Sequence, residues 1–522
     1  MKDLTSSVYT FEDLIQGNFL YVDKTEYIWQ LIRPAKEMYF LSRPRRFGKS
    51  LTLSTLKAVF EGKKELFKGL AIYDKPYDWK PYPIIHLDMA NCDVHTEVDL
   101  RDYLVRMMSR LAKQHGVNVD IQRTQLSSSF SDLIEEIAKE GPAVILLDEY
   151  DKPILENITS PDVLTIRNTL ADFYSAIKKE ADFERFVFIT GVSKFCHVSL
   201  FSKLNNLTDI TMDARYATML GYTQKEFETY FSDRIESVAK QQNLSRALLL
   251  PEIKAWYDGY RFEEDSESVY NPVSLARFFE QGGKFKNYWF ETGTPSFLME
   301  LVKKTKFNFD EVLSKPVSSM AFNAFEIDKI DPLTLLLQTG YLTIKSMVKK
   351  YNMPWYWLDF PNREVSFSFN TTLVNAYTRK SDNLVVNFSE QLTEAMETGN
   401  VKQLRKVMEV FFAGISYDVH HKNESNFQNI FFALFRLLGY YIKAESRTND
   451  GRIDAVAETD KYVFIFEFKL DNDDTALPQI KEKEYYKQYE LSGKKIFLNG
   501  VTFSTDKGQI IDWQTEEVKA DD

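Results

Sequence analysis

The sequence has very few cysteines and no long apolar run. Its 522 residues include only two cysteines, Cys92 and Cys196, and six histidines. Two cysteines are too few for a disulfide framework or a cysteine-rich zinc cluster, so we expect both to be packing residues. No segment approaches the roughly 20 consecutive apolar residues of a membrane helix, and residues 1–16 lack an apolar signal core. We therefore expect a cytoplasmic protein without a membrane partner.

The chain also lacks an excess of positive charge. Its 65 lysines and arginines are outnumbered by 76 acidic residues, which gives a net charge of −11. This balance argues against a protein that coats nucleic acid by bulk electrostatics, although it leaves room for a local basic groove. A hydrophobic content of 44% and a charged content of 27% are typical of a globular protein. The length predicts about three domains.

The clearest motif lies in residues 39–60, YFLSRPRRFGKSLTLSTLKAVF. An apolar run breaks at a Gly-Lys-Ser turn and continues with helical periodicity, which predicts a strand, a phosphate-binding loop and a helix. Backbone N–H groups around Gly48 would face a bound anion, Lys49 would reach the β- and γ-phosphates, and Ser50 would bind Mg²⁺ at the positive end of the helix. The motif therefore predicts ATP with Mg²⁺ as ligand.

The motif departs from the general pattern G-x-x-x-x-G-K-[ST] in one place. Arg43 occupies the first glycine position, and the loop also carries Arg45 and Arg46, which we include among the candidate nucleotide-binding residues. Because a Gly-Lys-Ser tripeptide is common, this motif taken alone fits a plain helix start with a solvated lysine equally well.

A second acidic motif favours the nucleotide interpretation. Residues 142–151 read PAVILLDEYD, a buried-strand run that ends in adjacent carboxylates. In a nucleotide hydrolase Asp148 would bind Mg²⁺ through water, and Glu149 would act as the catalytic group that polarises the attacking water. The alternative is a parallel strand that ends in a solvated acidic turn. An expected strand at 82–89 and helix at 100–115 separate the two motifs, as in P-loop ATPases with an additional strand, so right-handed crossovers should make the sheet parallel.

Several segments together resemble a known family. They are RPRRFGKS at 43–50, YVDKT at 21–25, LLDEYDKP at 146–153 and ITGVSKF at 189–195. The chain resembles the AAA-ATPase-like family of bacterial proteins, whose members typically carry a PD-(D/E)xK nuclease-like domain at the C-terminus. The family's loop also has an arginine at the first glycine position, as Arg43 does here. The resemblance implies that YVDKT lies beside the nucleotide. Thr190 and Ser193 fall at the end of an expected strand at 186–192, where a hydroxyl or amide would sense the γ-phosphate. The alternative is that Thr190 is an ordinary strand residue.

The C-terminal part carries a second candidate site. Asp454 begins one expected strand, and Glu467 and Lys469 fall late in the next, where period-two alternation places both on one face. Two carboxylates on adjacent strands bind Mg²⁺ or Mn²⁺, while the lysine positions or activates water. This is the D…E-x-K arrangement of PD-(D/E)xK nucleases, with Ile453 where the motif name has proline. The resemblance adds Glu424 as a further metal ligand. An E-x-K alone is a frequent accident on a strand.

The expected architecture is α/β. A P-loop NTPase domain with a parallel sheet and helices on both faces would span 1–220, a helical or winged-helix-like region 221–385, and an α/β PD-(D/E)xK nuclease-like domain 386–522. We expect helices at 223–231 and 245–256, a helical pattern up to about residue 350, and a short strand at 365–369.

Our leading hypothesis is an ATP-binding and ATP-hydrolysing protein whose P-loop module regulates or drives a metal-dependent nuclease acting on DNA. The alternative is a nucleotide-gated switch or interaction protein whose nuclease fold binds without cleaving. A P-loop kinase is disfavoured, because adjacent Asp148 and Glu149 suit attack by water better than transfer to an organic acceptor. The sequence does not separate DNA from RNA or an endonuclease from an exonuclease, and it leaves a homo-oligomer open.

Overall fold

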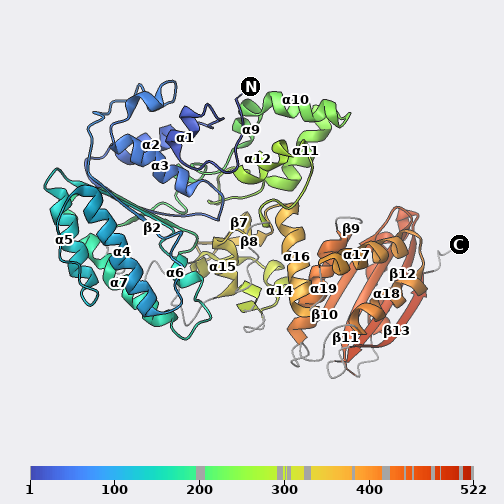
Figure 1. Ribbon diagram of the computed structural model, residues 1–522. Helices are drawn as coiled ribbons and strands as arrows, with labels where there is room; N and C mark the ends of the chain where they lie inside the picture. The colour runs from blue at the N-terminus through green and yellow to red at the C-terminus, as the bar shows by residue number, and fades with distance from the viewer. Residues whose placement is uncertain are drawn as a thin grey trace. The chain divides into compact units, whose positions relative to one another are not determined.

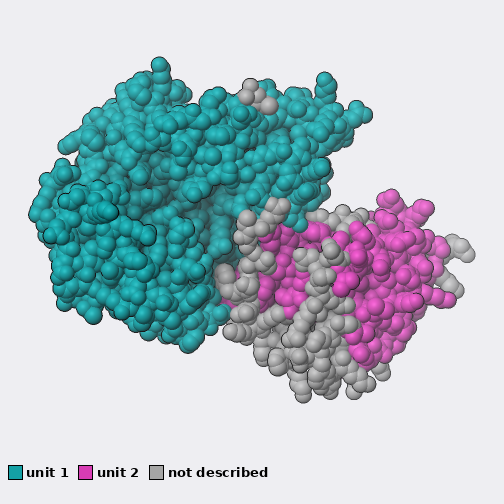
Figure 2. All heavy atoms as spheres, in the orientation of Figure 1, with its two compact units in different colours: residues 1–289, 318–363 teal, residues 290–317, 364–522 magenta. Residues whose placement is uncertain are grey.

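The computed structural model forms two compact units. It describes residues 2–194, 206–290, 298–299, 301–302, 307–322, 331–378, 382–413, 424–439, 443–449, 452–471, 476–482, 484–504 and 509–518. Unit 1 comprises residues 1–289 and 318–363, and unit 2 comprises 290–317 and 364–522 (Figure 2). The bounds of the three domains expected from the sequence stay a prediction.

A five-stranded parallel sheet forms the centre of unit 1. Its order is β2-β3-β4-β1-β5. The strands are β1 (Glu37–Ser42), β2 (Ile84–Asp88), β3 (Ala143–Asp148), β4 (Glu184–Gly191) and β5 (Thr208–Asp209). The strand β4 lies between β1 and β3, which confirms the additional-strand order expected from the sequence. The edge strand β5 contains only two residues.

Every residue of β3 and β4 is buried, because helices cover both faces of this sheet. Figure 1 shows α2 (Thr25–Ile32) and α3 (Lys49–Phe60) on one side, and α4 (Glu97–His115), α5 (Leu126–Ala138) and α7 (Val163–Lys179) on the other. Local sequence sets the helix ends. Thr96 and Asp99 form a capping box at the start of α4, and Gly116 ends it with a φ of +67°.

Four further helices of unit 1 pack around an aromatic core. They are α9 (Gln224–Tyr230), α10 (Ser232–Gln241), α11 (Arg246–Tyr257) and α12 (Pro272–Glu280). Their core includes Phe227, Phe231, Tyr257, Tyr270 and Tyr288, all buried. The expected helices at 223–231 and 245–256 are confirmed. We call these four helices the lid.

A small three-stranded sheet completes unit 1. It contains β6 (Val317–Ser318), β7 (Thr343–Lys350) and β8 (Met353–Asp359) in the order β6-β8-β7, with α15 (Pro332–Gln338) preceding β7. This strand order, with a helix before a hairpin, is that of a winged helix. The expectation of a helical pattern up to about residue 350 was therefore wrong for β7. The hairpin turn consists of Tyr351 and Asn352, both at positive φ, rather than a recognisable Asn-Gly pair.

Unit 2 contains a second five-stranded sheet in the order β13-β12-β11-β10-β9, in which only the β11 and β12 pair is parallel. The strands are β9 (Lys443–Asn449), β10 (Arg452–Glu458), β11 (Tyr462–Leu470), β12 (Lys495–Ser504) and β13 (Gln509–Glu517). The described helices are α14 (Phe309–Leu313), α16 (Arg363–Thr378), α17 (Asp382–Glu397), α18 (Val401–Ala413), α19 (Glu424–Leu438) and α20 (Ala476–Glu482). A final 3-10 helix spans Tyr485–Ser492.

The strand expected at residues 365–369 was wrong, because these residues belong to α16. The short segment VSFSF alternates apolar and polar residues, which is a strand pattern. Over a longer window, however, Val365, Phe369 and Leu373 recur every four residues and are all buried. Helical burial on this longer period therefore outweighs the local alternation.

The turn after α11 depends on a glycine. Gly259 has a φ of +104°, and a Cβ atom there would lie 2.0 Å from the carbonyl oxygen of Pro361. Substitution Gly259→Ala should therefore lower the free energy of unfolding by about 1–3 kcal/mol, measured by chemical or thermal unfolding. Gly69 is a matched control, because its φ is +83° but its Cβ would meet nothing within 4 Å. An equal loss in Gly69→Ala would show that the Pro361 contact is unimportant.

Candidate functional site

The phosphate loop connects β1 to α3. Gly48 has a φ of +93° and a ψ of 22°, and α3 begins at Lys49. This left-handed conformation favours glycine, and a Cβ at this position would meet nothing within 4 Å. The requirement for glycine is thus the backbone conformation, and the space above the loop is open. The first N–H groups of a helix have no acceptor within the helix, so the start of α3 beside Gly48 suits a phosphate.

Lys49 folds back over its own loop. Its Nζ donates to the carbonyl oxygens of Arg43 and Pro44, each at 3.0 Å, and the side chain is buried. Burial lowers the pKa of Lys49, while the carboxylates of Asp148 and Glu149 oppose that shift. The ammonium therefore lies between the loop and the acidic end of β3.

The acidic end of β3 lies opposite the loop. Burial raises the pKa of Asp148, while hydrogen bonding to Ser50 and the charge of Lys49 lower it. Burial also raises the pKa of Glu149, which Lys49 again opposes. The structure thus brings together Lys49 and Ser50 at the start of α3 with Asp148 and Glu149 at the end of β3. Hydroxyl and carboxylate oxygens are ligands that fit Mg²⁺, and a bound Mg²⁺ would neutralise phosphate charge there.

The three loop arginines have different environments. Arg43 is buried, and its guanidinium donates to the carbonyl oxygens of Ser42 (2.9 Å), Thr211 (2.7 Å) and Tyr216 (3.2 Å). It also lies 4.2 Å from the ring centroid of Phe262. Arg43 therefore supports the loop from beneath. Arg45 is exposed and Arg46 is half-buried, so these two are the loop arginines nearer to solvent.

Asp151 joins the acidic turn to the end of β4. The carboxylate is fully buried and accepts hydrogen bonds from the backbone N–H of Val192 (3.2 Å), the backbone N–H of Ser193 (2.7 Å) and the Ser193 hydroxyl (2.6 Å). Burial raises its pKa, and the bonds from Ser193 and Val192 lower it. The Ser193 hydroxyl, expected as a γ-phosphate sensor, thus donates to Asp151. The buried hydroxyl of Thr190 makes no hydrogen bond within the described part of the chain.

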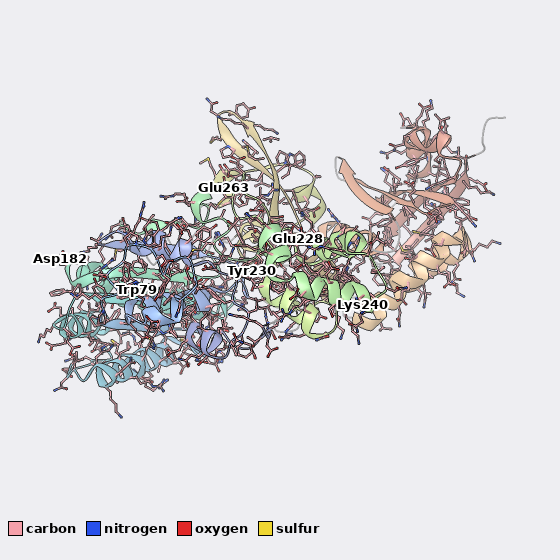
Figure 3. All side chains as sticks on the ribbon, turned by 90° about the horizontal axis from the view of Figure 1, so that it is seen from above. Trp79, Asp182, Glu228, Tyr230, Lys240 and Glu263 are labelled. Carbon is pink, nitrogen blue, oxygen red and sulfur yellow. The ribbon has the colours of Figure 1, made fainter. Side chains whose placement is uncertain are left out.

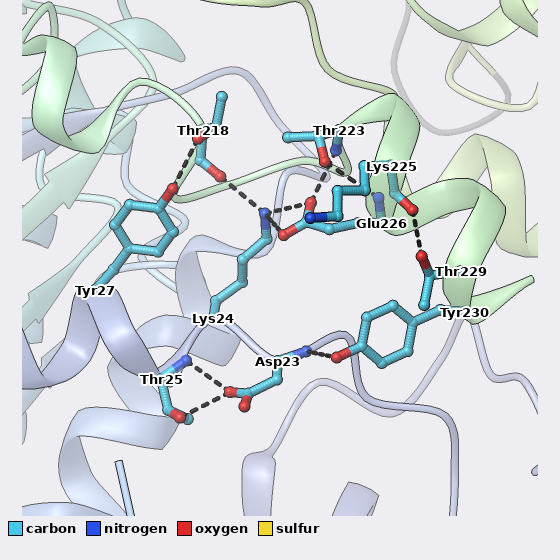
Figure 4. Close-up of polar contacts among 10 residues, drawn as sticks. All are labelled: Asp23, Lys24, Thr25, Tyr27, Thr218, Thr223, Lys225, Glu226, Thr229 and Tyr230. Carbon is cyan, nitrogen blue, oxygen red and sulfur yellow. Dashed lines mark hydrogen bonds and ion pairs between the residues drawn. The ribbon is translucent and has the colours of Figure 1, made fainter. Parts of the chain in front are cut away.

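The YVDKT segment connects the core of unit 1 to the lid. Lys24 Nζ donates to the Thr218 carbonyl oxygen at 2.8 Å and to Glu226 at 2.7 Å (Figure 4). The Asp23 carboxylate accepts from the backbone N–H and the hydroxyl of Thr25. Burial lowers the pKa of Lys24, and Glu226 opposes this. A place beside the nucleotide stays a prediction for this segment.

The candidate metal site in unit 2 lies on β10 and β11. Asp454 pairs directly with Glu467 in their antiparallel register, an arrangement in which opposite residues share one face. Glu467 is fully buried and Lys469 is 5% exposed, with Lys469 Nζ 3.9 Å from Glu467 Oε1. The side chains of Asp454 and Glu424 lie outside the described residues. Within the described residues, no group of three His, Cys, Asp or Glu side chains forms a metal cluster.

Comparison with known proteins gives the relationship of the whole chain. A family model described as a predicted AAA-ATPase matches residues 6–201, and a model of the PD-(D/E)XK nuclease superfamily matches residues 422–513. A protein of Azotobacter chroococcum mcd 1, described as an uncharacterized protein in the vnfD 5′ region, is 35% identical over 531 residues and is covered over 99% of both chains. The chain belongs to the AAA-ATPase-like family. Its C-terminal part belongs to the PD-(D/E)XK nuclease superfamily.

One solved structure aligns with this AAA-ATPase-like chain at low similarity. It is the ORC2 protein of Aeropyrum pernix in ADPNP and ADP complexes, at 9% identity and a TM-score of 0.26. The alignment covers 68% of this chain and 90% of that one. The parallel sheet and its strand order establish the α/β fold of unit 1 independently of this alignment. Among the described helices, none combines the length and the hydropathy that crossing a bilayer requires.

Sequence reasoning missed two residues of the AAA-ATPase-like site. Asp151 follows the two recognised carboxylates, but its role depends on the pairing of β3 with β4, which the local sequence does not give. The buried side chain of Arg43 supports the phosphate loop through its contact with Phe262, which is more than 200 residues away in sequence. The one available signal was Arg43 itself, a charged residue where the general motif needs a glycine.

The bonds of Asp151 predict that its charge and both oxygens matter. Substitution Asp151→Asn replaces one acceptor oxygen with an amide NH₂ group, which cannot accept a hydrogen bond from Val192 or Ser193. We expect a loss of about 1–3 kcal/mol in the free energy of unfolding and slower ATP turnover. Denaturant unfolding and a phosphate-release assay measure the two effects. Asp162→Asn is the control, since Asp162 precedes α7 without a side-chain cap bond. Unchanged stability in Asp151→Asn would contradict the proposed link between β3 and β4.

Proposed function

We propose that this AAA-ATPase-like protein binds and hydrolyses ATP in unit 1 and that unit 2 is a metal-dependent nuclease acting on DNA. The observation that supports the ATPase assignment is that Lys49 and Ser50 at the start of α3 lie close to Asp148 and Glu149 at the end of β3. Lys49 would contact the β- and γ-phosphates, and Ser50 and Asp148 would bind Mg²⁺. Glu149 would orient and polarise the attacking water.

Two features of Glu149 support a role in hydrolysis. The pKa of Glu149 is raised by burial, so its carboxylate is a better proton acceptor than a solvated glutamate. Its backbone also has a φ of +51°, an uncommon conformation for a non-glycine residue. Local strain of this kind is frequent at catalytic positions. We therefore assign Glu149 as the general base or water-orienting group.

The nuclease assignment is supported by the register of β10 and β11. Asp454 and Glu467 occupy paired positions, and Lys469 lies two residues farther along the same strand face. We propose that Asp454, Glu467 and Glu424 bind Mg²⁺ or Mn²⁺ and that Lys469 positions water. The metal would supply Lewis-acid activation of a phosphodiester and a more acidic bound water.

We further propose that nucleotide state regulates cleavage. A regulatory effect is limited by the difference in ATP affinity between two states of the protein, and a tenfold change in cleavage needs about 1.4 kcal/mol of such a difference. The alternative function, a nucleotide-gated switch that binds nucleic acid without cleaving it, is favoured by one observation. Glu467 is fully buried and Lys469 nearly so, whereas a working metal site must admit a phosphate.

The first test concerns ATP. Substitution Lys49→Met removes the charge that would contact the phosphates, so we expect ATP affinity to fall about 10- to 100-fold in a direct binding titration. Lys57→Met is the control, because Lys57 lies on the same helix and pairs with Glu61 at 3.8 Å. Glu149→Gln should retain ATP binding and lose turnover by about 10²-fold or more. Equal ATP affinity in Lys49→Met and the parent would refute the phosphate-loop assignment.

The second test concerns cleavage. Glu467→Gln keeps the side-chain size but removes the charge that attracts a divalent cation, so Mg²⁺- or Mn²⁺-dependent cleavage of DNA should be lost. ATP binding should persist, because the four nucleotide residues belong to unit 1. Glu458→Gln is the matched control on β10, where Glu458 pairs with Lys494 at 2.8 Å. If the parent protein cleaves neither DNA nor RNA with either metal, the switch is the better description of unit 2.

A further inference from the structure

The β7–β8 hairpin has an exposed end that the ATPase and nuclease sites do not use. In Figure 3 the hairpin extends away from the body of unit 1, with Glu263 labelled near its base. Lys349, Lys350, Tyr351, Asn352 and Met353 form its end and are all exposed. We call these five residues the hairpin tip.

Positive charge is concentrated at the hairpin tip. Lys349 and Lys350 make no ion pair with any carboxylate in the described ranges. Lys350 Nζ lies 5.5 Å from the ring centroid of Trp355, a cation–π contact that positions the ammonium along β8. The acidic residues near this sheet are farther down the hairpin, where Glu264 accepts a hydrogen bond from the Tyr356 hydroxyl at 2.8 Å. The tip is thus a local cationic surface on a protein with a net charge of −11.

Tyr351 occupies a position that its own conformation disfavours. Tyr351 and Asn352 have φ values of +52° and +60°, which is the type I′ hairpin turn that prefers Asn, Asp and Gly. A tyrosine in the left-handed region costs about 1–2 kcal/mol relative to a favourable conformation. Its ring gains no burial in return, because it is 89% exposed. An aromatic side chain that is strained and solvated at once indicates a role in binding.

The two tryptophans of β8 extend this aromatic character along one face of the hairpin. Val348 pairs with Trp355 and Lys350 pairs with Met353, so these side chains share a face. Trp355 and Trp357 are half-buried on it, whereas Tyr356 and Leu358 alternate with them and are buried. The outer face therefore combines Lys350 with the two tryptophan rings. Lys349 pairs with Pro354 on the other face, where the buried ring of Tyr356 contacts Phe322.

We propose that the hairpin tip binds nucleic acid, with Lys349 and Lys350 contacting phosphates and Tyr351 stacking on a base or sugar. Two exposed lysines beside the exposed ring of Tyr351 match the two chemistries of a nucleic-acid strand, its charged backbone and its flat bases. This inference rests on the proposed function for the class of ligand. It does not require cleavage, because the tip is separate in sequence from Asp454, Glu467 and Lys469.

The test measures binding of the full-length protein to a labelled oligonucleotide by fluorescence anisotropy. A single strand and its duplex are titrated separately over a range of salt concentrations, with EDTA present so that no cleavage occurs. Removing two phosphate contacts in the double variant Lys349→Ala, Lys350→Ala should lower the slope of log K against log salt by about 1.4 for a single strand or about 1.8 for a duplex. A loss with either form supports the proposal.

The ring of Tyr351 is tested by Tyr351→Asn. Asparagine is favoured in a type I′ turn, so this variant should unfold at the same temperature as the parent or higher. It should nevertheless bind about tenfold more weakly, since each stacked base contributes substantially to affinity. Retained stability with lost affinity cannot arise from an unfolded hairpin.

The charge control is the double variant Lys225→Ala, Lys240→Ala, which removes the same charge from exposed positions on the lid (Lys240 is labelled in Figure 3). It should keep the parent's slope. Parent affinity and slope in the hairpin variants, or an equal loss in the lid variant, would overturn the proposal. Cleavage and ATP turnover of the parent are measured separately. Binding through the tip without cleavage would reject the nuclease and keep this inference, whereas cleavage with tip-independent binding would do the reverse.

Discussion

The candidate nucleotide site of unit 1 places one buried ammonium near three buried or half-buried carboxylates. Lys49 is within electrostatic range of Asp148, Glu149 and Asp151, and burial shifts the pKa of every one of these groups against its charged form. One positive charge cannot offset three negative ones. The triphosphate that we propose as ligand would add further negative charge, which the proposed Mg²⁺ would offset. This explains physically why Ser50 and Asp148 lie together at the start of α3 and the end of β3.

Buried contacts explain why the phosphate loop has an arginine at position 43. A glycine at position 43 would leave the carbonyl oxygens of Thr211 and Tyr216 without their donor, whereas Arg43 bonds both and stacks on Phe262. The loop also rests on Phe47, whose ring lies 4.8 Å from Tyr260 and 5.3 Å from Phe262. Residues 256–262, WYDGYRF, therefore include the rings on which the phosphate loop packs. Its aromatic residues are explained by packing, and Gly259 by the close approach of Pro361.

Local patterns predicted the elements whose burial is decided within a few residues. The strands β3, β4 and β11 are apolar runs of ordinary length. The phosphate loop and the E-x-K motif are recognisable from their own residues. The sequence did not predict the β7–β8 hairpin, because its turn is Tyr351-Asn352 rather than a pair that contains glycine. It did not predict β13 either, because no recognised turn precedes that strand. Residues 365–369 look like a strand until a longer window shows helical burial. Asp151 escaped for a different reason, since its partners come from β4 and only strand pairing brings them together.

Burial imposes a further condition on the second site. Glu467 has no exposed surface, and its partner Lys469 lies 3.9 Å away in a nearly buried position. A carboxylate without solvent gains a divalent cation only if that cation sheds water on entry, which favours a site already rich in oxygen ligands. The register supplies one such neighbour, Asp454, directly opposite. For the nuclease that we propose, access of a phosphodiester would involve a rearrangement around β10 and β11, and a bound nucleotide could favour one of the two states. A nuclease site that must open before it cuts has a closed state and an open state, and ATP could favour one of them. The buried site in unit 2 is therefore compatible with the proposed regulation by ATP.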